Sequence, residues 1–160
     1  HMFTSTPTVK INLCRPGAKM PTYATQGSAC FDLYAVLDEP HYCCVGEPVI
    51  VPVGLKFDIP EGYVLMVYSR SGHGFKNDVR LSNCVGVIDS DYTGEVMVKL
   101  SQDVDSYEEE DGMHDPFWIN HGDRIAQAML IPVQQVQFEE LSEPPEQKGN
   151  RVGGFGSSGK

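Results

Sequence analysis

The chain has 160 residues, 41% of them hydrophobic and 21% charged, which suits one domain with a buried core. No hydrophobic run approaches the roughly 20 residues of a membrane span, and no basic and hydrophobic leader opens the sequence, so we expect a cytoplasmic protein without a membrane segment. The net charge of −10 repels a phosphate backbone and argues against direct nucleic-acid binding, although local Arg and Lys residues can still bind a small phosphorylated ligand.

The first part of the chain consists of β-rich runs separated by turn residues. TVKINLC (residues 8–14) alternates from Val9 onward, and residues 48–69 carry Pro and Gly between hydrophobic stretches. VGVIDSDYTGEVMVKL (residues 85–100) has two β-rich arms around a polar turn, which predicts a hairpin. Such turn signals, about every 8 to 12 residues, predict an all-β barrel or jelly roll. A short helix is expected only after Ser71.

The later segments are less regular. RIAQAMLIPVQQVQFEEL (residues 124–141) fits a helix or strands, and its β-branched residues around Pro132 favour strands. Residues 101–122 form an acidic insertion loop whose end, Phe117–Ile119, is expected to pack onto the body. We expect a β-barrel domain over residues 1–141 and a flexible C-terminal arm over residues 142–160, since Pro, Gly and mixed charges follow Leu141.

Several stretches carry polar side chains that suit a phosphorylated ligand. Arg70, Ser71 and Gly72 follow a hydrophobic strand, and Ser71 is expected to cap a short helix. A plain turn explains the same residues. Asp32 lies between two hydrophobic residues, where it either pairs locally or faces a cation and water. Arg124 and Gln127 would share a face on a helix but not on a strand, and Arg124 alternatively has a structural role in pairing with a carboxylate.

Residues 83–95 combine carboxylates with an amide and a tyrosine. Asp89 or Asp91 can act as a general base toward water, although a turn Asp often only binds backbone groups. Asn83 brings both a donor and an acceptor, as a base-reading amide would. In the arm, Arg151 and the glycines around Phe155 can contact phosphate, and Phe155 can stack on a ring. Together these groups point to a nucleotide and a hydrolytic water.

The five cysteines match neither a zinc site nor a disulfide framework, so we expect free buried or semi-buried thiols in a reducing cytosol.

Five of these stretches, in order, resemble the five motifs of the trimeric dUTP diphosphatases (dUTPases). They are GSACFDLYA, SRSG, NCVGVIDSDYTGE, GDRIAQ and RVGGFGSSG. The resemblance implies a distorted jelly-roll or β-clip subunit in a homotrimer with shared active sites, from a phage or bacterial source. It also implies hydrolysis of dUTP to dUMP and pyrophosphate with Mg²⁺, which excludes uracil from DNA and supplies dUMP for dTMP synthesis.

The resemblance also implies roles for single residues. Asp89 matches the carboxylate that deprotonates the water attacking the α-phosphate and receives the 3′-OH, and Tyr92 matches the aromatic under the sugar. The uracil slot matches Asn83, Gly86, Val87, Ile88 and Met97. The phosphate contacts match Arg70, Ser71, Gly72 and Gln127. The closing arm matches Arg151, Phe155, Gly156, Ser157 and Ser158. Asp32 matches the acid held near Mg²⁺ through water.

Three departures from the family pattern and two rival functions accompany this resemblance. Ser69 stands where Pro is usual, Phe31 is bulkier than usual, and residues 101–122 are long for the family. A dCTP deaminase would need a catalytic Glu where this chain has residues 89–92, DSDY. The other rival is a catalytically silent protein that binds a regulatory partner, for which residues 101–122 are the candidate surface.

Overall fold

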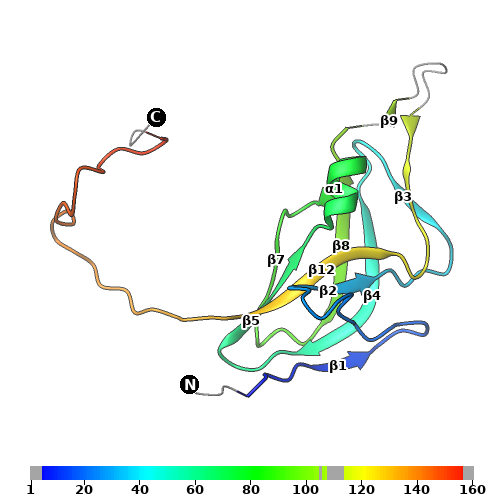
Figure 1. Cartoon of the computed structure of the whole chain (residues 1–160), viewed down its shortest axis with the longest axis horizontal. Coiled ribbons are helices and arrows are strands. Elements are labelled where there is room, and N and C mark those ends of the chain that lie inside the picture. Colours follow the sequence, from blue (N-terminus) through cyan, green and yellow to red (C-terminus); the bar gives the residue numbers. More distant parts are fainter. Residues whose placement is uncertain (1–4, 105, 108–113, 157–160) are drawn as a thin grey trace.

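The structure is a computed structural model that describes residues 5–104, 106–107 and 114–156 (Figure 1). Its elements, in chain order, are β1 (Lys10–Leu13), β2 (Phe31–Tyr34), β3 (His41–Cys43), β4 (Val49–Asp58), β5 (Tyr63–Tyr68), α1 (Ser71–Asn77), β6 (Val79–Leu81), β7 (Gly86–Ile88), β8 (Glu95–Gln102), β9 (Ser106–Tyr107), β10 (His114–Asp115), β11 (Phe117–Ile119) and β12 (Arg124–Pro132). The prediction of a nearly all-β chain with one short helix is confirmed. No helix among these residues is long and apolar enough to cross a membrane.

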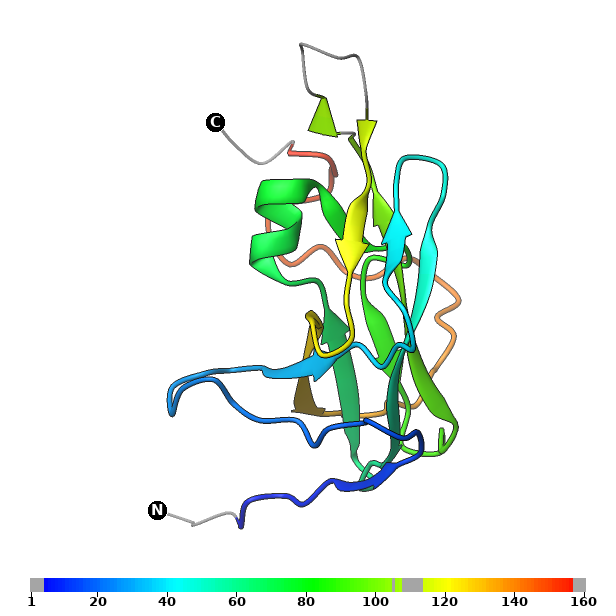
Figure 2. The ribbon, with the colours of Figure 1, turned by 90° about the vertical axis from the view of Figure 1, so that its right-hand side faces the viewer.

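Two antiparallel four-stranded sheets form the body. One has the order β1-β4-β8-β6 and the other β2-β12-β5-β7, and the views in Figures 1 and 2 show them wrapped around a common interior. Alternation within the strands explains this arrangement: in β8, Val96, Val98 and Leu100 are buried, while Met97 and Lys99 point outward. Leu65 and Val67 of β5 fill the same core from the other sheet.

The predicted hairpin over residues 85–100 is wrong, because its two arms belong to different sheets. β7 pairs with β5, whereas β8 pairs with β4 and β6. The alternating pattern requires only that each arm bury one face, and here each arm does so against a different neighbour. The turn itself is present: the Tyr92 N–H donates to the Asp89 carbonyl at 3.1 Å, and the Tyr92 hydroxyl donates to the Glu95 carbonyl at 2.9 Å. The diverging arms leave a space between the sheets.

The helix α1 is confirmed where it was expected, but Ser71 is its first residue and not its cap. Arg70 takes the extended cap position and no side-chain hydrogen bond caps the helix. The helix ends at Asn77. Its C-cap is Asp78, whose φ of 53° is left-handed and whose N–H donates to the His73 carbonyl. α1 therefore begins after a gap of two residues from β5, and Arg70 lies between the two elements.

The strand prediction beyond Pro132 is wrong for the single chain. β12 ends at Pro132, which has no N–H to donate, and the side chains of Val136 and Phe138 are 65% and 95% exposed. The following segment extends away from the body (Figure 1).

The hydrophobic end of the insertion packs onto the body, as predicted. β11 pairs with β3, and Ile119 is fully buried. Trp118 stays exposed and lies against Tyr42, with ring centroids 5.2 Å apart. The acidic run at residues 108–111 lies outside the described residues.

All five cysteines lie within the described residues and none of them is in a disulfide. Cys84 is exposed, so the expectation of buried or semi-buried thiols is wrong for this residue. Burial raises the pKa of the Cys43 thiol to about 11, so this thiol is unreactive at neutral pH.

Candidate functional site

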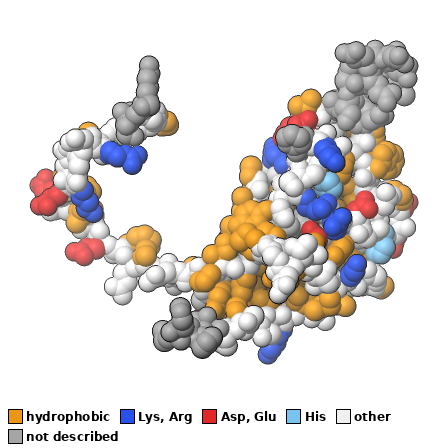
Figure 3. Space-filling view, viewed as in Figure 1, with side chains coloured by type: hydrophobic (Ala, Val, Ile, Leu, Met, Phe, Trp, Pro, Cys, Tyr) orange, Lys and Arg blue, Asp and Glu red, His pale blue; other side chains and the backbone are white. Residues whose placement is uncertain are grey.

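Asp32 of β2 is the centre of a basic pocket on the second sheet. Its carboxylate is largely buried, and its two oxygens face Arg70 Nε at 3.5 Å and Arg124 Nη1 at 3.8 Å. We call this the arginine pocket, and its lining residues are Ala24, Ser28, Ala29, Cys30, Asp32, Arg70, Ser71, Arg124 and Gln127. Two guanidinium groups outnumber one carboxylate, so the pocket favours an anion. Figure 3 shows Lys and Arg side chains gathered near the beginning of β12.

A β-bulge in β12 brings Arg124 and Gln127 into this pocket together. Arg124 pairs with Tyr34 and Ala126 pairs with Leu33, so Ile125 is an extra residue between them. Ile125 and Ala126 are consecutively buried as a result. The prediction that these two residues could share a face only on a helix is therefore wrong, because the bulge shifts the alternation by one position.

Hydrogen bonds to backbone carbonyls fix two of the polar side chains in the pocket. Arg70 Nη1 donates to the Arg124 carbonyl at 3.3 Å, and Gln127 Nε2 donates to the Ser69 carbonyl at 2.9 Å. These contacts hold the end of β5 against the beginning of β12. The guanidinium of Arg70 keeps further N–H groups for a ligand.

His73 of α1 lies behind the arginine pocket. Burial lowers the pKa of His73, and the nearby charges of Arg70 and Arg124 lower it further, while Asp123 raises it. Its ring packs edge-on against Phe117, with centroids 5.0 Å apart. The ring therefore favours its neutral form, and it joins the helix to the end of the insertion.

The second pocket opens where β7 and β8 diverge. We call this pocket, of about 250 Å³, the turn pocket, and its lining residues are Val67, Leu81, Asn83, Gly86, Val87, Ile88, Asp89, Tyr92, Glu95, Val96, Met97, Val98 and Lys99. These include every residue that the sequence assigned to a uracil and sugar site.

Close packing explains two glycines at this pocket. A Cβ on Gly86 would lie 3.0 Å from the Cβ of Val67, and a Cβ on Gly94 would lie 2.7 Å from the Tyr92 hydroxyl. The absence of side chains lets β7 lie close to β5 and lets the Tyr92 ring fold over the turn. Backbone groups of β7 can consequently approach a flat ligand.

An ion pair fixes the side chain of Glu95 at the edge of the turn pocket. Arg15, in the loop after β1, donates from its guanidinium to the Glu95 carboxylate. This hydrogen bond is the main cause that lowers the pKa of Glu95 below its usual range. The carboxylate therefore remains ionised at the pocket entrance.

The predicted site residues fall into two separate places on one chain. The turn pocket and the arginine pocket have no lining residue in common. Gly72 is the second residue of α1 and lines neither pocket. The described arm residues Arg151, Phe155 and Gly156 also line neither, and Phe155 is fully exposed. Ser157 and Ser158 lie outside the described residues.

The sequence analysis left open whether Arg124 binds a ligand or pairs with a carboxylate. It did not identify Ser28 and Cys30 as lining residues of the arginine pocket. The pairing of Arg124 with a carboxylate, one of those two roles, is confirmed by its contact with Asp32. Its position directly before a hydrophobic run in GDRIAQ was the available signal, since a charged residue at a strand end often lines a site.

Within the described residues, no group of three or more His, Cys, Asp or Glu side chains could hold a metal ion by itself. Asp32 offers one carboxylate among two guanidiniums. This donor set fits Mg²⁺ held mainly by phosphate oxygens and water, because Mg²⁺ commonly keeps its waters and binds one or two carboxylates plus substrate phosphates.

Comparisons with known proteins agree on one family. The dUTPase family model matches residues 17–159. A deoxyuridine 5′-triphosphate nucleotidohydrolase of Pseudomonas paraeruginosa is 43% identical over 141 residues, which cover 88% of this chain and 87% of the relative. A protein of the same name from a Janthinobacterium species is 40% identical over 154 residues, covering 95% of this chain and 96% of the relative.

Solved structures of phage proteins share the fold. The dUTPase of Staphylococcus bacteriophage 80alpha, solved with dUPNHPP, has a TM-score of 0.79 and 25% identity, covering 97% of this chain and 100% of that one. A mutant dUTPase from phage phi11 of S. aureus, whose structure reveals the coordination of a structural Mg(II) ion, has a TM-score of 0.72 and 22% identity, covering 88% and 100%.

Proposed function

Because this chain belongs to the dUTPase family, we propose that it hydrolyses dUTP to dUMP and pyrophosphate by attack of water on the α-phosphate. The reaction would keep uracil out of DNA and supply dUMP for dTMP synthesis, in the cytoplasm. The observation that carries the proposal is the turn pocket, where the amide of Asn83, the backbone of β7 and the carboxylate of Asp89 line one space beside Tyr92.

Asp89 is the proposed general base. It is exposed at the edge of the turn pocket, where water can reach its carboxylate. Its backbone carbonyl accepts the Tyr92 N–H bond of the turn, which leaves the carboxylate available. The Tyr92 ring is fixed by its hydroxyl bond to Glu95, so it can form a rigid floor under the sugar. A ribose 2′-OH would clash there. Asn83 and the backbone of β7 can pair with the uracil edge, and mispaired polar groups would reject cytosine strongly.

In this proposal the triphosphate binds in the arginine pocket, where Arg70, Arg124 and Gln127 can stabilise charge on the phosphate oxygens. Asp32 would hold Mg²⁺ through water, and the ion would supply charge neutralisation on the triphosphate when bound. Ser71 can add a hydroxyl contact, and Gly72 a backbone contact. The arm, with Arg151, Phe155, Gly156, Ser157 and Ser158, would close over the nucleotide, with Phe155 stacked on uracil.

We further propose a homotrimer in which the turn pocket of one copy meets the arginine pocket of another. The separation of the two pockets on one chain supports this arrangement, since neither contains a complete site. Hydrophobic side chains also gather on the face over β5 and β7 (Figure 3). Val87 of β7 and Met97 of β8 are 60% and 47% exposed. A ring of three copies would cover this face.

The test is pyrophosphate release from dUTP, dTTP, dCTP and UTP, each with and without Mg²⁺. We expect rapid release from dUTP with Mg²⁺ and little from the other three nucleotides. Release of ammonia from dCTP would assign the chain to the deaminases. Binding of a regulatory protein through residues 101–122 is a second proposal, supported by the exposed Trp118 at the end of that insertion and the exposed Tyr42 of β3 beside it.

A further inference from the structure

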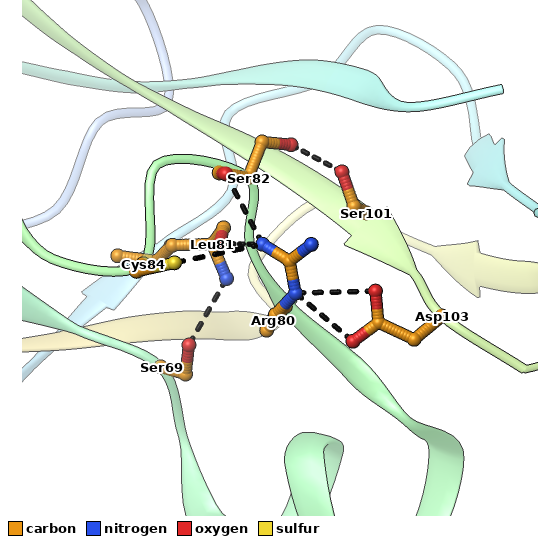
Figure 4. A network of polar contacts seen from close by, with 7 residues as sticks. All are labelled: Ser69, Arg80, Leu81, Ser82, Cys84, Ser101 and Asp103. Carbon is orange, nitrogen blue, oxygen red and sulfur yellow. Dashed lines mark hydrogen bonds and ion pairs between the residues drawn. The ribbon is translucent and has the colours of Figure 1, made fainter. Parts of the chain in front are cut away.

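Arg80 is the centre of a polar network beside the turn pocket (Figure 4). Its Nε donates to both carboxylate oxygens of Asp103, at 3.1 and 2.9 Å. Its Nη1 donates to the carbonyls of Leu81 and Ser82, at 2.9 and 3.1 Å. One guanidinium therefore joins Asp103, directly after β8, to the consecutive carbonyls of Leu81, the last residue of β6, and Ser82. The fixed fork of the guanidinium allows this, whereas a lysine ammonium would not reproduce it.

The two carbonyls belong to a tight turn over residues 81–84, which we call the Asn83 turn. The Cys84 N–H donates back to the Leu81 carbonyl at 3.0 Å, and Cys84 has a left-handed φ of 67°. A non-glycine residue in this conformation is strained, so the turn needs contacts from outside itself. Three further contacts anchor its beginning: the Leu81 N–H donates to the Ser69 hydroxyl at 3.0 Å, the Ser82 N–H donates to the Lys99 carbonyl at 2.8 Å, and the hydroxyls of Ser82 and Ser101 are bonded.

We propose that Arg80 is a positioning residue for substrate recognition: oriented by Asp103, it holds the Asn83 turn and so places Asn83 in the turn pocket. Asn83 is exposed. Its carbonyl accepts from the Val85 N–H at 2.8 Å, and its side-chain Nδ2 donates a long bond of 3.4 Å to the Val85 carbonyl. Its side chain therefore depends on the backbone of its own turn for its position. This inference rests on the proposed function, because Asn83 is taken there to read the base.

The exposed location of Arg80 and Asp103 indicates that their contacts position the Asn83 turn more than they stabilise the fold. The Arg80 and Asp103 side chains are 40% and 50% exposed, and surface ion pairs of that kind contribute little to the free energy of unfolding. The charge-assisted bonds from Arg80 to the two carbonyls instead end on the residues on the N-terminal side of Asn83. Loss of these bonds is expected to make the position of the Asn83 turn in the turn pocket less defined, while the hydrophobic core stays intact.

The experiment compares Arg80→Met, Asp103→Asn and Arg80→Lys with the unchanged chain. We measure kcat and KM for dUTP, the Kd for dUMP and dCMP by calorimetry, and the melting temperature. Arg80→Met is expected to raise KM and the Kd for dUMP about 3- to 10-fold, the size of one or two lost hydrogen bonds. The change in kcat should stay within about twofold, since the interaction is the same in the ground and transition states. The preference for dUMP over dCMP should fall with it, and Arg80→Lys should not restore either.

Charge provides the matched control. Arg80→Met makes the net charge more negative and Asp103→Asn makes it less negative, so long-range attraction of an anion predicts opposite changes in affinity. Positioning predicts weaker binding in both, by about 2- to 5-fold in Asp103→Asn. Lys10→Met, on the exposed edge strand β1, repeats the charge change of Arg80→Met away from either pocket.

The inference would be overturned if the dUMP Kd changed in opposite directions in Arg80→Met and Asp103→Asn, or if it were unchanged in both. A lower melting temperature in either variant would not alter that conclusion. If Arg80→Met does not fold, the Kd of Asp103→Asn for dUMP tests the inference by itself. The unchanged chain tests the proposed function separately: absent pyrophosphate release would refute hydrolysis, while the dUMP Kd of the variants would still decide the role of Arg80.

Discussion

Asp89 and Asp91 flank Ser90 in the same turn, and only one of them lines the turn pocket. Asp89 lines both the turn pocket and a neighbouring hollow formed with Glu61 and Tyr63, whereas Asp91 lines only the hollow of these two. Asp89→Asn should bind dUTP yet lose about 10²- to 10⁴-fold in kcat, because an amide cannot accept the proton of the attacking water. Asp91→Asn, with the same chemical change two residues away, should keep its turnover. Normal turnover by Asp89→Asn in a pyrophosphate assay would show that the base is another group.

His73 should make stability depend on pH. Burial lowers its pKa in the folded chain below its usual value, so the unfolded chain binds more protons and stability falls as pH drops through about 6.5. His73→Leu keeps a hydrophobic contact for Phe117 and removes the titration. The melting temperature of the unchanged chain should therefore fall more steeply between pH 7.5 and pH 5.5 than that of His73→Leu. Parallel pH curves for the two proteins would contradict this account.

At the scale of elements, the long strand β4 depends on one glycine. Gly54 has a φ of 69°, and a Cβ there would lie 2.7 Å from the Cβ of Ala18 and 3.1 Å from Val36. Gly54→Ala should reduce the free energy of unfolding by about 2–4 kcal/mol, from backbone strain and overpacking together. Gly46→Ala is the matched control, because its φ of 81° is similar and nothing lies within 4 Å of the added Cβ. Denaturant unfolding should show a clearly smaller loss for Gly46→Ala, and equal losses would mean that packing at Gly54 is unimportant.

At the scale of the whole molecule, shared sites can be tested by mixing two inactive variants. Asp89→Asn damages only the turn pocket, and Arg70→Ala damages only the arginine pocket. If each site combines the two pockets from different copies, chains refolded together in equal amounts should recover about a quarter of full activity, because random assembly pairs two intact pockets that often. Light scattering should give about three times the chain mass of 17.7 kDa. A monomeric mass, or a mixture as inactive as its components, would refute the shared site.

The sequence by itself determined the fold class, the motif residues and the family. Alternation and turn residues predicted an all-β chain because burial of one strand face depends on local pattern. The residues of the third motif lie together at the turn pocket because they are close in sequence and one turn places them. Asp89, Tyr92 and the backbone of β7 needed no distant contact to be brought together.

Only the tertiary structure decided which elements become neighbours. The arms at residues 85–100 separated into two sheets, a bulge at Ile125 brought Arg124 and Gln127 together, and β12 stopped at Pro132. The separation of the arms and the bulge depend on strand pairing between residues far apart in the chain, and a local pattern specifies which face is buried but not which partner buries it. The end of β12 has in addition a local cause, the missing N–H of Pro132. The contacts of Arg80 with Asp103 and of Ser69 with Leu81 belong to the same class.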